Sequence, residues 1–127
     1  MFQGIESIIL FSEDAKKLAD FYKEKVGLKL TLEAEMGEEN TSLYGFDFGG
    51  GPGLYMMNHS KVKGSSQEPE RFMFNLEVSG NIEEAVKKLE DAGVKKIQDI
   101  YHIENYGYIA TFEDIDGNYF QLVKTKP

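Results

Sequence analysis

The side chains that most often carry out chemistry in proteins are few in this chain. Cysteine is absent, which excludes a thiolate metal site, a cysteine nucleophile and a disulfide. The histidines are His59 and His102, and His102 stands two residues before Glu104 in the segment YHIEN. A histidine and a glutamate at this spacing can bind metal, although such pairs are common on surfaces. We favour solvated or loop-anchoring roles for both histidines, and keep His102, in an expected loop, as a candidate ligand contact or general base.

The segment 112–123, FEDIDGNYFQLV, predicts two strands joined by a turn. Glycine and asparagine at 117 and 118 favour this turn because both tolerate positive φ. The pattern has a counterpart 66 residues earlier: Gly27 corresponds to Gly93, and Gly51 to Gly117. We interpret the shared spacing as a duplicated supersecondary unit, each copy too small to bury its own apolar face.

Hydrophobic periodicity predicts the order β-α-β-β-β in each copy. In the first copy we expect strands at 5–11, 28–32, 41–48 and 54–57, a helix from Ser12 or Asp14 to Gly27, an acidic loop at 34–40 and a glycine turn at 49–53. In the second copy we expect strands at 72–78, 95–100, 108–112 and 119–124, and a helix that Asn81 caps and Gly93 ends. The polar segment 61–70 predicts a linker, so residues 1–127 are expected to form one domain of two modules, 1–60 and 71–127.

Composition fits this interpretation. A chain of 127 residues with 41% hydrophobic and 28% charged residues is typical of one globular domain. No apolar run approaches the ~20 residues of a membrane helix, and residues 1–4 do not resemble a signal peptide, so we expect a cytoplasmic protein. The net charge of −8 argues against nucleic acid or a membrane surface as partner and permits a cationic ligand.

A paired β-α-β-β-β module resembles the vicinal oxygen chelate superfamily, the group of glyoxalase I, bleomycin-resistance protein and extradiol dioxygenase. The residues that carry the resemblance are Asp14, Phe21-Tyr22, Val26-Gly27-Leu28, Ala85-Val86, Leu89, Ala92-Gly93-Val94, Phe112, Asp114 and Asp116-Gly117-Asn118. Ile115 stands where many relatives have proline. The resemblance implies an α+β fold of the glyoxalase/bleomycin resistance/dihydroxybiphenyl dioxygenase type: two tandem βαβββ modules with curved mixed sheets around a shared cavity and helices outside. It also implies a homodimer.

Metal-dependent members of this superfamily hold a divalent ion with four cavity-facing side chains, two from each module. Motif spacing carries these positions over to Ser7, Tyr55, Met73 and Gln121, and the 66-residue offset pairs Ser7 with Met73 and Tyr55 with Gln121. Serine, tyrosine and methionine are poor ligands for Zn²⁺, Ni²⁺ or Fe²⁺. A register error of one residue would bring in Glu6 or Phe74 instead. We therefore predict no metal and no other cofactor.

With the strands aligned in this way, the side chains that alternate onto the cavity side are mostly apolar, aromatic or methionine. The predicted ligand-binding residues are Ser7, Phe11, Tyr55, Met57, Met73, Asn75, Glu77, Tyr119 and Gln121. Such a lining suits an organic ligand of moderate size, although Ile9, Met57 and Val123 are better explained as core. Glu77 could hold a cationic ligand, and Glu77 and His102 are the two weak catalytic candidates.

Three functions remain open from the sequence. The first is a small-molecule-binding protein of the glyoxalase/bleomycin-resistance type, a homodimer that sequesters an organic and possibly cationic ligand without a metal. The alternative is a divergent lyase or dioxygenase that uses a divalent metal held by Gln121 with Glu6, His59 or His102. The third is an accessory or regulatory domain with a vestigial, filled cavity.

Overall fold

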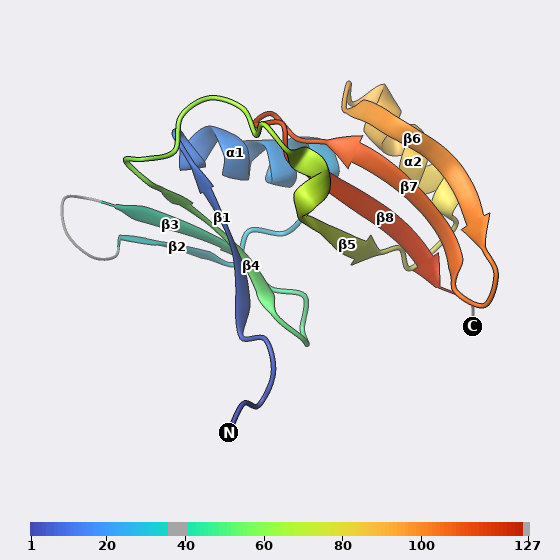
Figure 1. Cartoon of the computed structure of the whole chain (residues 1–127), viewed down its shortest axis with the longest axis horizontal. Coiled ribbons are helices and arrows are strands. Elements are labelled where there is room, and N and C mark those ends of the chain that lie inside the picture. The colour runs from blue at the N-terminus through green and yellow to red at the C-terminus, as the bar shows by residue number, and fades with distance from the viewer. Residues whose placement is uncertain (36–40, 126–127) are drawn as a thin grey trace. The chain divides into compact units, whose positions relative to one another are not determined.

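The computed structural model describes residues 1–35 and 41–125. The chain divides into two compact units, which we call unit 1 (Met1–Gly64) and unit 2 (Ser65–Pro127) (Figure 1). The division falls within the segment 61–70. No helix in the described part of the chain is long and apolar enough to cross a membrane.

Each unit is a four-stranded mixed sheet with one α-helix, and the strands and the α-helix follow the same order in both. Unit 1 contains β1 (Ser7–Ser12), α1 (Ala15–Phe21), the π-helical turn η1 (Tyr22–Val26), β2 (Leu32–Glu35), β3 (Ser42–Phe46) and β4 (Gly53–Asn58). Unit 2 contains the 3₁₀ turn η2 (Pro69–Arg71), β5 (Met73–Glu77), α2 (Ile82–Asp91), β6 (Lys95–Ile103), β7 (Gly107–Glu113) and β8 (Tyr119–Thr125). The strand orders are β1-β4-β3-β2 and β5-β8-β7-β6, with the first pair of each parallel and the others antiparallel.

The 66-residue offset holds down to the pairing of single residues. Ser7 pairs with Gly53 in unit 1, and Met73 pairs with Tyr119 in unit 2. Gly45 lies opposite Tyr55, as Thr111 lies opposite Gln121. A shift of one residue would turn every side chain to the other face, so this match confirms the duplicated βαβββ unit.

In unit 1, α1 packs against β1, β3 and β4. Leu18 and Tyr22 of this helical segment are fully buried, together with Phe46 of β3 and Met56 of β4. Along β1 the alternation is clear, since Leu10 is buried while its neighbours Ile9 and Phe11 are 41% and 42% exposed. One face of the sheet is therefore covered by the helix, and the other, which we call the helix-distal face, is not.

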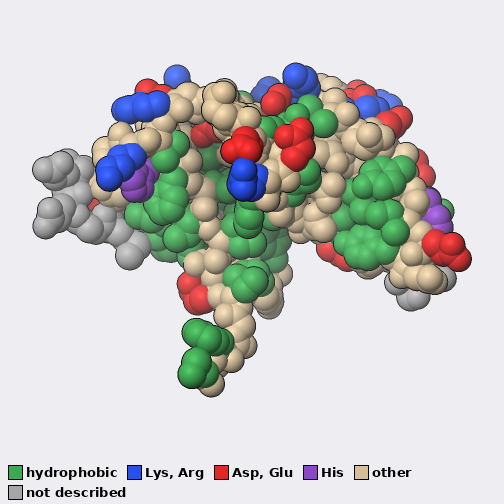
Figure 2. Space-filling view, in the orientation of Figure 1, with side chains coloured by type: hydrophobic (Ala, Val, Ile, Leu, Met, Phe, Trp, Pro, Cys, Tyr) green, Lys and Arg blue, Asp and Glu red, His purple; other side chains and the backbone are tan. Residues whose placement is uncertain are grey.

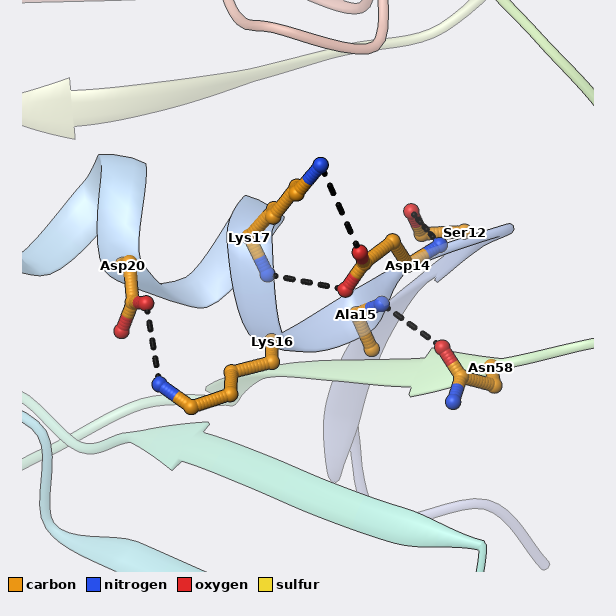
Figure 3. A network of polar contacts seen from close by, with 7 residues as sticks. All are labelled: Ser12, Asp14, Ala15, Lys16, Lys17, Asp20 and Asn58. Carbon is orange, nitrogen blue, oxygen red and sulfur yellow. Dashed lines mark hydrogen bonds and ion pairs between the residues drawn. The ribbon is translucent and has the colours of Figure 1, made fainter.

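The start of α1 is tied to the ends of both parallel strands (Figure 3). The Asp14 carboxylate accepts from the Lys17 amide at 3.2 Å, and Asn58 Oδ1 accepts from the Ala15 amide at 2.6 Å. Ser12, which pairs with Asn58, accepts from the Asp14 amide at 3.0 Å. Three backbone donors at the helix start thus have side-chain acceptors, which fixes the position at which β1 ends and α1 begins.

In unit 2 the helix is again capped by a side chain and packed on the sheet, but different residue types do so. Asn81 accepts from the Glu84 amide at 3.2 Å as the expected cap of α2, and Gly93 just past the helix has φ +85°, as the sequence predicts. Phe120 stacks between Phe74 and Phe112, with ring centroids 5.9 and 6.1 Å apart. Phe120 belongs to β8, one of the strands that α2 contacts, and all three rings are buried.

The structure corrects the expected strand at 28–32. The Leu28 amide donates to Tyr22 O, so this residue closes the helical segment instead of joining a sheet. The Thr31 amide donates to Gly45 O and its hydroxyl accepts from the Asp47 amide, and the β2 strand begins only at Leu32. The expected acidic loop at 34–40 is also too long, because residues 34 and 35 belong to β2; positions 36–40 lie outside the described residues.

Candidate ligand-binding site

The helix-distal face of unit 1 is apolar and partly exposed. Ile9 pairs with Tyr55, and Phe11 pairs with Met57, so these four side chains and Ser7 share the face. Tyr55 and Met57 are half-buried. Figure 2 shows hydrophobic side chains open to the surface over the strands, a pattern that often marks a binding surface.

The Tyr55 ring lies where a side chain at position 45 would lie, and it borders the space at position 53 together with Asp47, whose Oδ1 would be 2.8 Å from an added Cβ. A Cβ atom added at Gly45 would lie 2.7 Å from Cε1 and 2.8 Å from Cδ1 of Tyr55. A Cβ atom added at Gly53 would lie 3.1 Å from both Cε1 and Cζ of the same ring. Gly45 and Gly53 therefore let the ring settle against the backbone of β3 and β4.

Polar pairs occupy the helix-distal face of unit 2. The Gln121 Nε2 atom donates to Thr111 Oγ1 at 3.1 Å, and the Asn75 Nδ2 atom donates to the Tyr106 hydroxyl at 3.4 Å. Asn75 pairs with Gln121 across the parallel strands, so both amides stand side by side. Met73 and Tyr119 pair one step earlier on the same face and add apolar surface.

Glu77 lies at the end of this face, but its carboxylate has partners of its own. Its oxygens accept from the Thr125 amide at 3.0 Å and from the Thr125 hydroxyl at 2.8 Å. The backbone and hydroxyl hydrogen bonds from Thr125 hold the pKa of Glu77 below its ordinary value. A lowered pKa makes a carboxylate a weaker base, which disfavours general-base chemistry at Glu77; its predicted contact with a ligand stays a prediction.

The structure corrects the expected position of His102. His102 belongs to β6, which continues to Ile103, and not to a loop. It pairs with Tyr108, whose own partner is Lys124, and the His102 and Tyr108 ring centroids are 4.8 Å apart. Gln121 pairs with Thr111 of β7, and Tyr108 lies three residues before Thr111 on the same strand, so the two point to opposite faces. His102, the partner of Tyr108, therefore lies on the opposite face of the sheet from Gln121.

His59 lies beside the end of the unit 1 face. Its amide donates to Ser12 O, and its Nδ1 accepts from the Lys61 amide at 3.1 Å. Its ring meets Phe11 edge to face, with centroids 5.3 Å apart. These contacts describe a residue that anchors the chain after β4, the role that we favoured from the sequence.

The four positions inferred for a metal fall into two pairs on the helix-distal faces. Ser7 and Tyr55 share the face of unit 1, and Met73 and Gln121 share the face of unit 2. Their side-chain groups are a hydroxyl, a phenol, a thioether and an amide, without an imidazole or carboxylate. This donor set does not fit a catalytic Zn²⁺, Ni²⁺ or Fe²⁺ ion. Among residues 1–35 and 41–125, no three His, Asp or Glu side chains gather in a geometry suited to a metal.

Sequence reasoning missed the residues that support the site. Gly45, Gly53 and Thr111 each touch a predicted ligand-binding side chain, and Tyr106 lies within reach of Asn75. The 66-residue offset contained part of the signal, because it aligns Gly45 with Thr111 once Tyr55 is aligned with Gln121. Only the cross-strand register shows that these residues face one another.

Comparisons with known proteins agree with the observed fold. An uncharacterized protein of Bacillus subtilis (strain 168), YetH, is 29% identical over 122 residues, which cover 96% of this chain and 98% of that protein. The fold resembles TnmS3, an antibiotic binding protein from Streptomyces sp. CB03234, with a TM-score of 0.76, 19% identity and coverage of 98% of each chain. It also resembles the fosfomycin resistance protein FosX from Listeria monocytogenes, with a TM-score of 0.73, 16% identity and coverage of 99% of this chain and 96% of that one. A family model matches residues 4–122, and the chain thus belongs to the Glyoxalase/Bleomycin resistance protein/Dioxygenase superfamily.

Proposed function

We propose that this protein binds a small organic molecule on the helix-distal faces of its units and sequesters it without a catalytic metal. The observation that carries the proposal is the exposed apolar surface of unit 1, where Ile9 and Phe11 are 41% and 42% exposed beside the half-buried Tyr55 and Met57. Burial of such side chains against a ligand is favourable at about 25 cal/mol per Å². The antibiotic binding protein TnmS3 has a similar fold, which supports the choice of a binding function.

The polar side chains of unit 2 indicate that the proposed ligand also carries hydrogen-bonding groups. Asn75 and Gln121 can donate and accept hydrogen bonds, and they lie on the face of unit 2 beside Met73 and Tyr119. The net charge of −8 favours the approach of a cation. We therefore expect an amphipathic ligand that combines an apolar or aromatic part with hydrogen-bonding groups, and that carries a positive charge.

Native mass spectrometry tests the proposal directly. The protein is purified without chelators and without a metal-affinity tag, so that bound metal and retained ligand both survive. We expect a homodimer without stoichiometric transition metal, with an added mass when ligand is retained. One transition-metal ion per chain would overturn the metal-free proposal and favour a metal-dependent lyase or dioxygenase.

A series of three aromatic dyes tests binding and charge preference together. Thioflavin T is cationic, Nile red is neutral and 8-anilinonaphthalene-1-sulfonate is anionic. The chain contains no tryptophan, so the dye signal is free of indole fluorescence. We expect saturable binding with thioflavin T preferred; absence of saturable binding for all three, with no retained ligand, would contradict the proposed function.

A further inference from the structure

We propose that Gly45 and Gly53 are positioning residues, which hold the Tyr55 ring as a fixed platform for a planar aromatic group of the ligand. The inference rests on the proposed function and deepens it in two respects: it names the ligand class and the device that fixes the contact.

Backbone conformation does not explain these two glycines. Glycine is often required where φ is positive, as at Gly49 and Gly51 in the turn before β4, with φ of +85° and +72°. Gly45 and Gly53 are not among the positive-φ glycines of the described residues, and both lie within strands. Glycine weakens a strand because it loses more entropy on folding and packs no side chain. A reason for the missing Cβ must therefore be sought in what fills its place.

The Tyr55 ring fills the place of a side chain at position 45 and borders the place at position 53, where Asp47 Oδ1 lies nearer, at 2.8 Å from an added Cβ. Cε1 of this ring is among the atoms that an added Cβ would meet at either glycine, 2.7 Å from position 45 and 3.1 Å from position 53. Contacts below 3.0 Å are essentially never seen for real Cβ atoms, so a side chain at position 45 must displace the ring. The two glycines thus leave the room in which the ring lies.

Tyr55 shares its face of the sheet with partly exposed apolar residues. Ile9, the partner of Tyr55 on β1, is 41% exposed, and Tyr55 itself is half-buried. An aromatic side chain that rests against the backbone loses less entropy on binding than a free one, and it offers a π surface for offset stacking. At the equivalent place in unit 2, Gln121 bonds Thr111 and offers an amide instead. The aromatic contact is therefore assigned to the helix-distal face of unit 1.

Dye binding to a set of variants tests the assignment. The variant Gly45→Ala places a methyl group where the ring lies, whereas the control Gly50→Ala has no positive φ and nothing within 4 Å of its added Cβ. We expect Gly45→Ala and Tyr55→Leu each to weaken thioflavin T binding about tenfold, and Gly50→Ala to leave it unchanged. The double variant Gly45→Ala/Tyr55→Leu should bind like Tyr55→Leu alone, because no ring is left to displace.

A non-aromatic probe separates stacking from general apolar contact. 1-Adamantanamine is an apolar cation without a π surface, and we expect the Tyr55→Leu change to leave its affinity, measured by calorimetry, within about twofold. Equal loss for both probes would overturn the aromatic assignment, and so would unchanged dye affinity in Gly45→Ala.

Proton chemical shifts test the ring position without any ligand. An aromatic ring shifts the Hα resonances of glycines that it touches, so those of Gly45 and Gly53 should move in Tyr55→Leu and stay in place in Gly50→Ala. Failure to move would overturn the positioning role. If the shifts behave as expected while no dye binds to the unmodified protein, the positioning is correct and the proposed function is wrong.

Discussion

Gly45 lies directly opposite Tyr55 in the antiparallel pair β3–β4, and the tyrosine ring occupies the space that a side chain at position 45 would need. On the helix-distal face, the Tyr55 ring and any side chain at position 45 therefore compete for the same space. Because a protein interior tolerates overpacking poorly, the two positions should be energetically coupled.

We expect Gly45→Ala to lower the free energy of unfolding by about 1–3 kcal/mol when Tyr55 is present. In the Tyr55→Leu background the same change should cost less, since leucine has no ε carbon and the contact at 2.7 Å with Cε1 is removed. Urea unfolding of the four proteins measures this coupling. Equal costs in both backgrounds would show that the ring yields freely and is not held by the glycine.

A second prediction concerns the link between β4 and the start of α1. Asn58 Oδ1 accepts from the Ala15 amide at 2.6 Å, and Asn58→Ala leaves that donor without its side-chain partner. We expect a loss of about 1 kcal/mol in urea unfolding. Asn58→Asp keeps an acceptor oxygen and places a negative charge near the helix start, so it should retain most of the stability. Similar losses in both variants would argue against this hydrogen bond.

The sequence predicts the fold well because the fold depends on patterns that repeat. Alternation along β1 and β5, the cap at Asn81 and the glycine stops at Gly27 and Gly93 are local signals, and the structure confirms each of them. The strand at 28–32 is misplaced because hydrophobicity does not reveal that the Leu28 amide is used by the end of the helical segment. Apolar periodicity indicates which residues are buried, but it does not indicate which carbonyl a given backbone amide bonds.

The candidate site is less accessible to such reasoning because its chemistry depends on cross-strand partners. The alternation of side chains along the strands, together with the 66-residue offset, places Tyr55 and Gln121 at equivalent positions of the two units, as the registers show. It does not show that Tyr55 rests on two glycines or that Gln121 bonds Thr111. It also misses that Glu77 is engaged by Thr125, which lies 48 residues away in the chain.

A third prediction concerns the turn between β7 and β8. The Asp114 carboxylate, 5% exposed, accepts from the amides of Asp116 and Asn118 at 2.8 and 3.0 Å and from Asn118 Nδ2 at 3.0 Å. We expect Asp114→Ala to lower the free energy of unfolding by about 2–3 kcal/mol, because several donors lose a charged acceptor together. Ile115→Ala is the matched control in the same turn, since Ile115 is 50% exposed and should cost under about 0.5 kcal/mol. Comparable losses at both positions would mean that the turn is not organised by the carboxylate.

The last prediction is a pH dependence at the end of β5. The Thr125 amide and hydroxyl stabilise the charged form of Glu77, so the pKa of Glu77 is lower in the folded than in the unfolded protein. A lowered folded pKa contributes stability that is complete above the unfolded pKa of about 4.3 and is lost as pH falls through the folded value. The direct measurement is a carbon-detected NMR titration of the Glu77 carboxylate. In Thr125→Val the hydroxyl is gone but the amide remains, so the pKa should rise only part of the way toward its ordinary value. In Thr125→Ser both donors remain and the pKa should stay low. An unchanged pKa in Thr125→Val would show that the hydroxyl bond at 2.8 Å does not persist in solution.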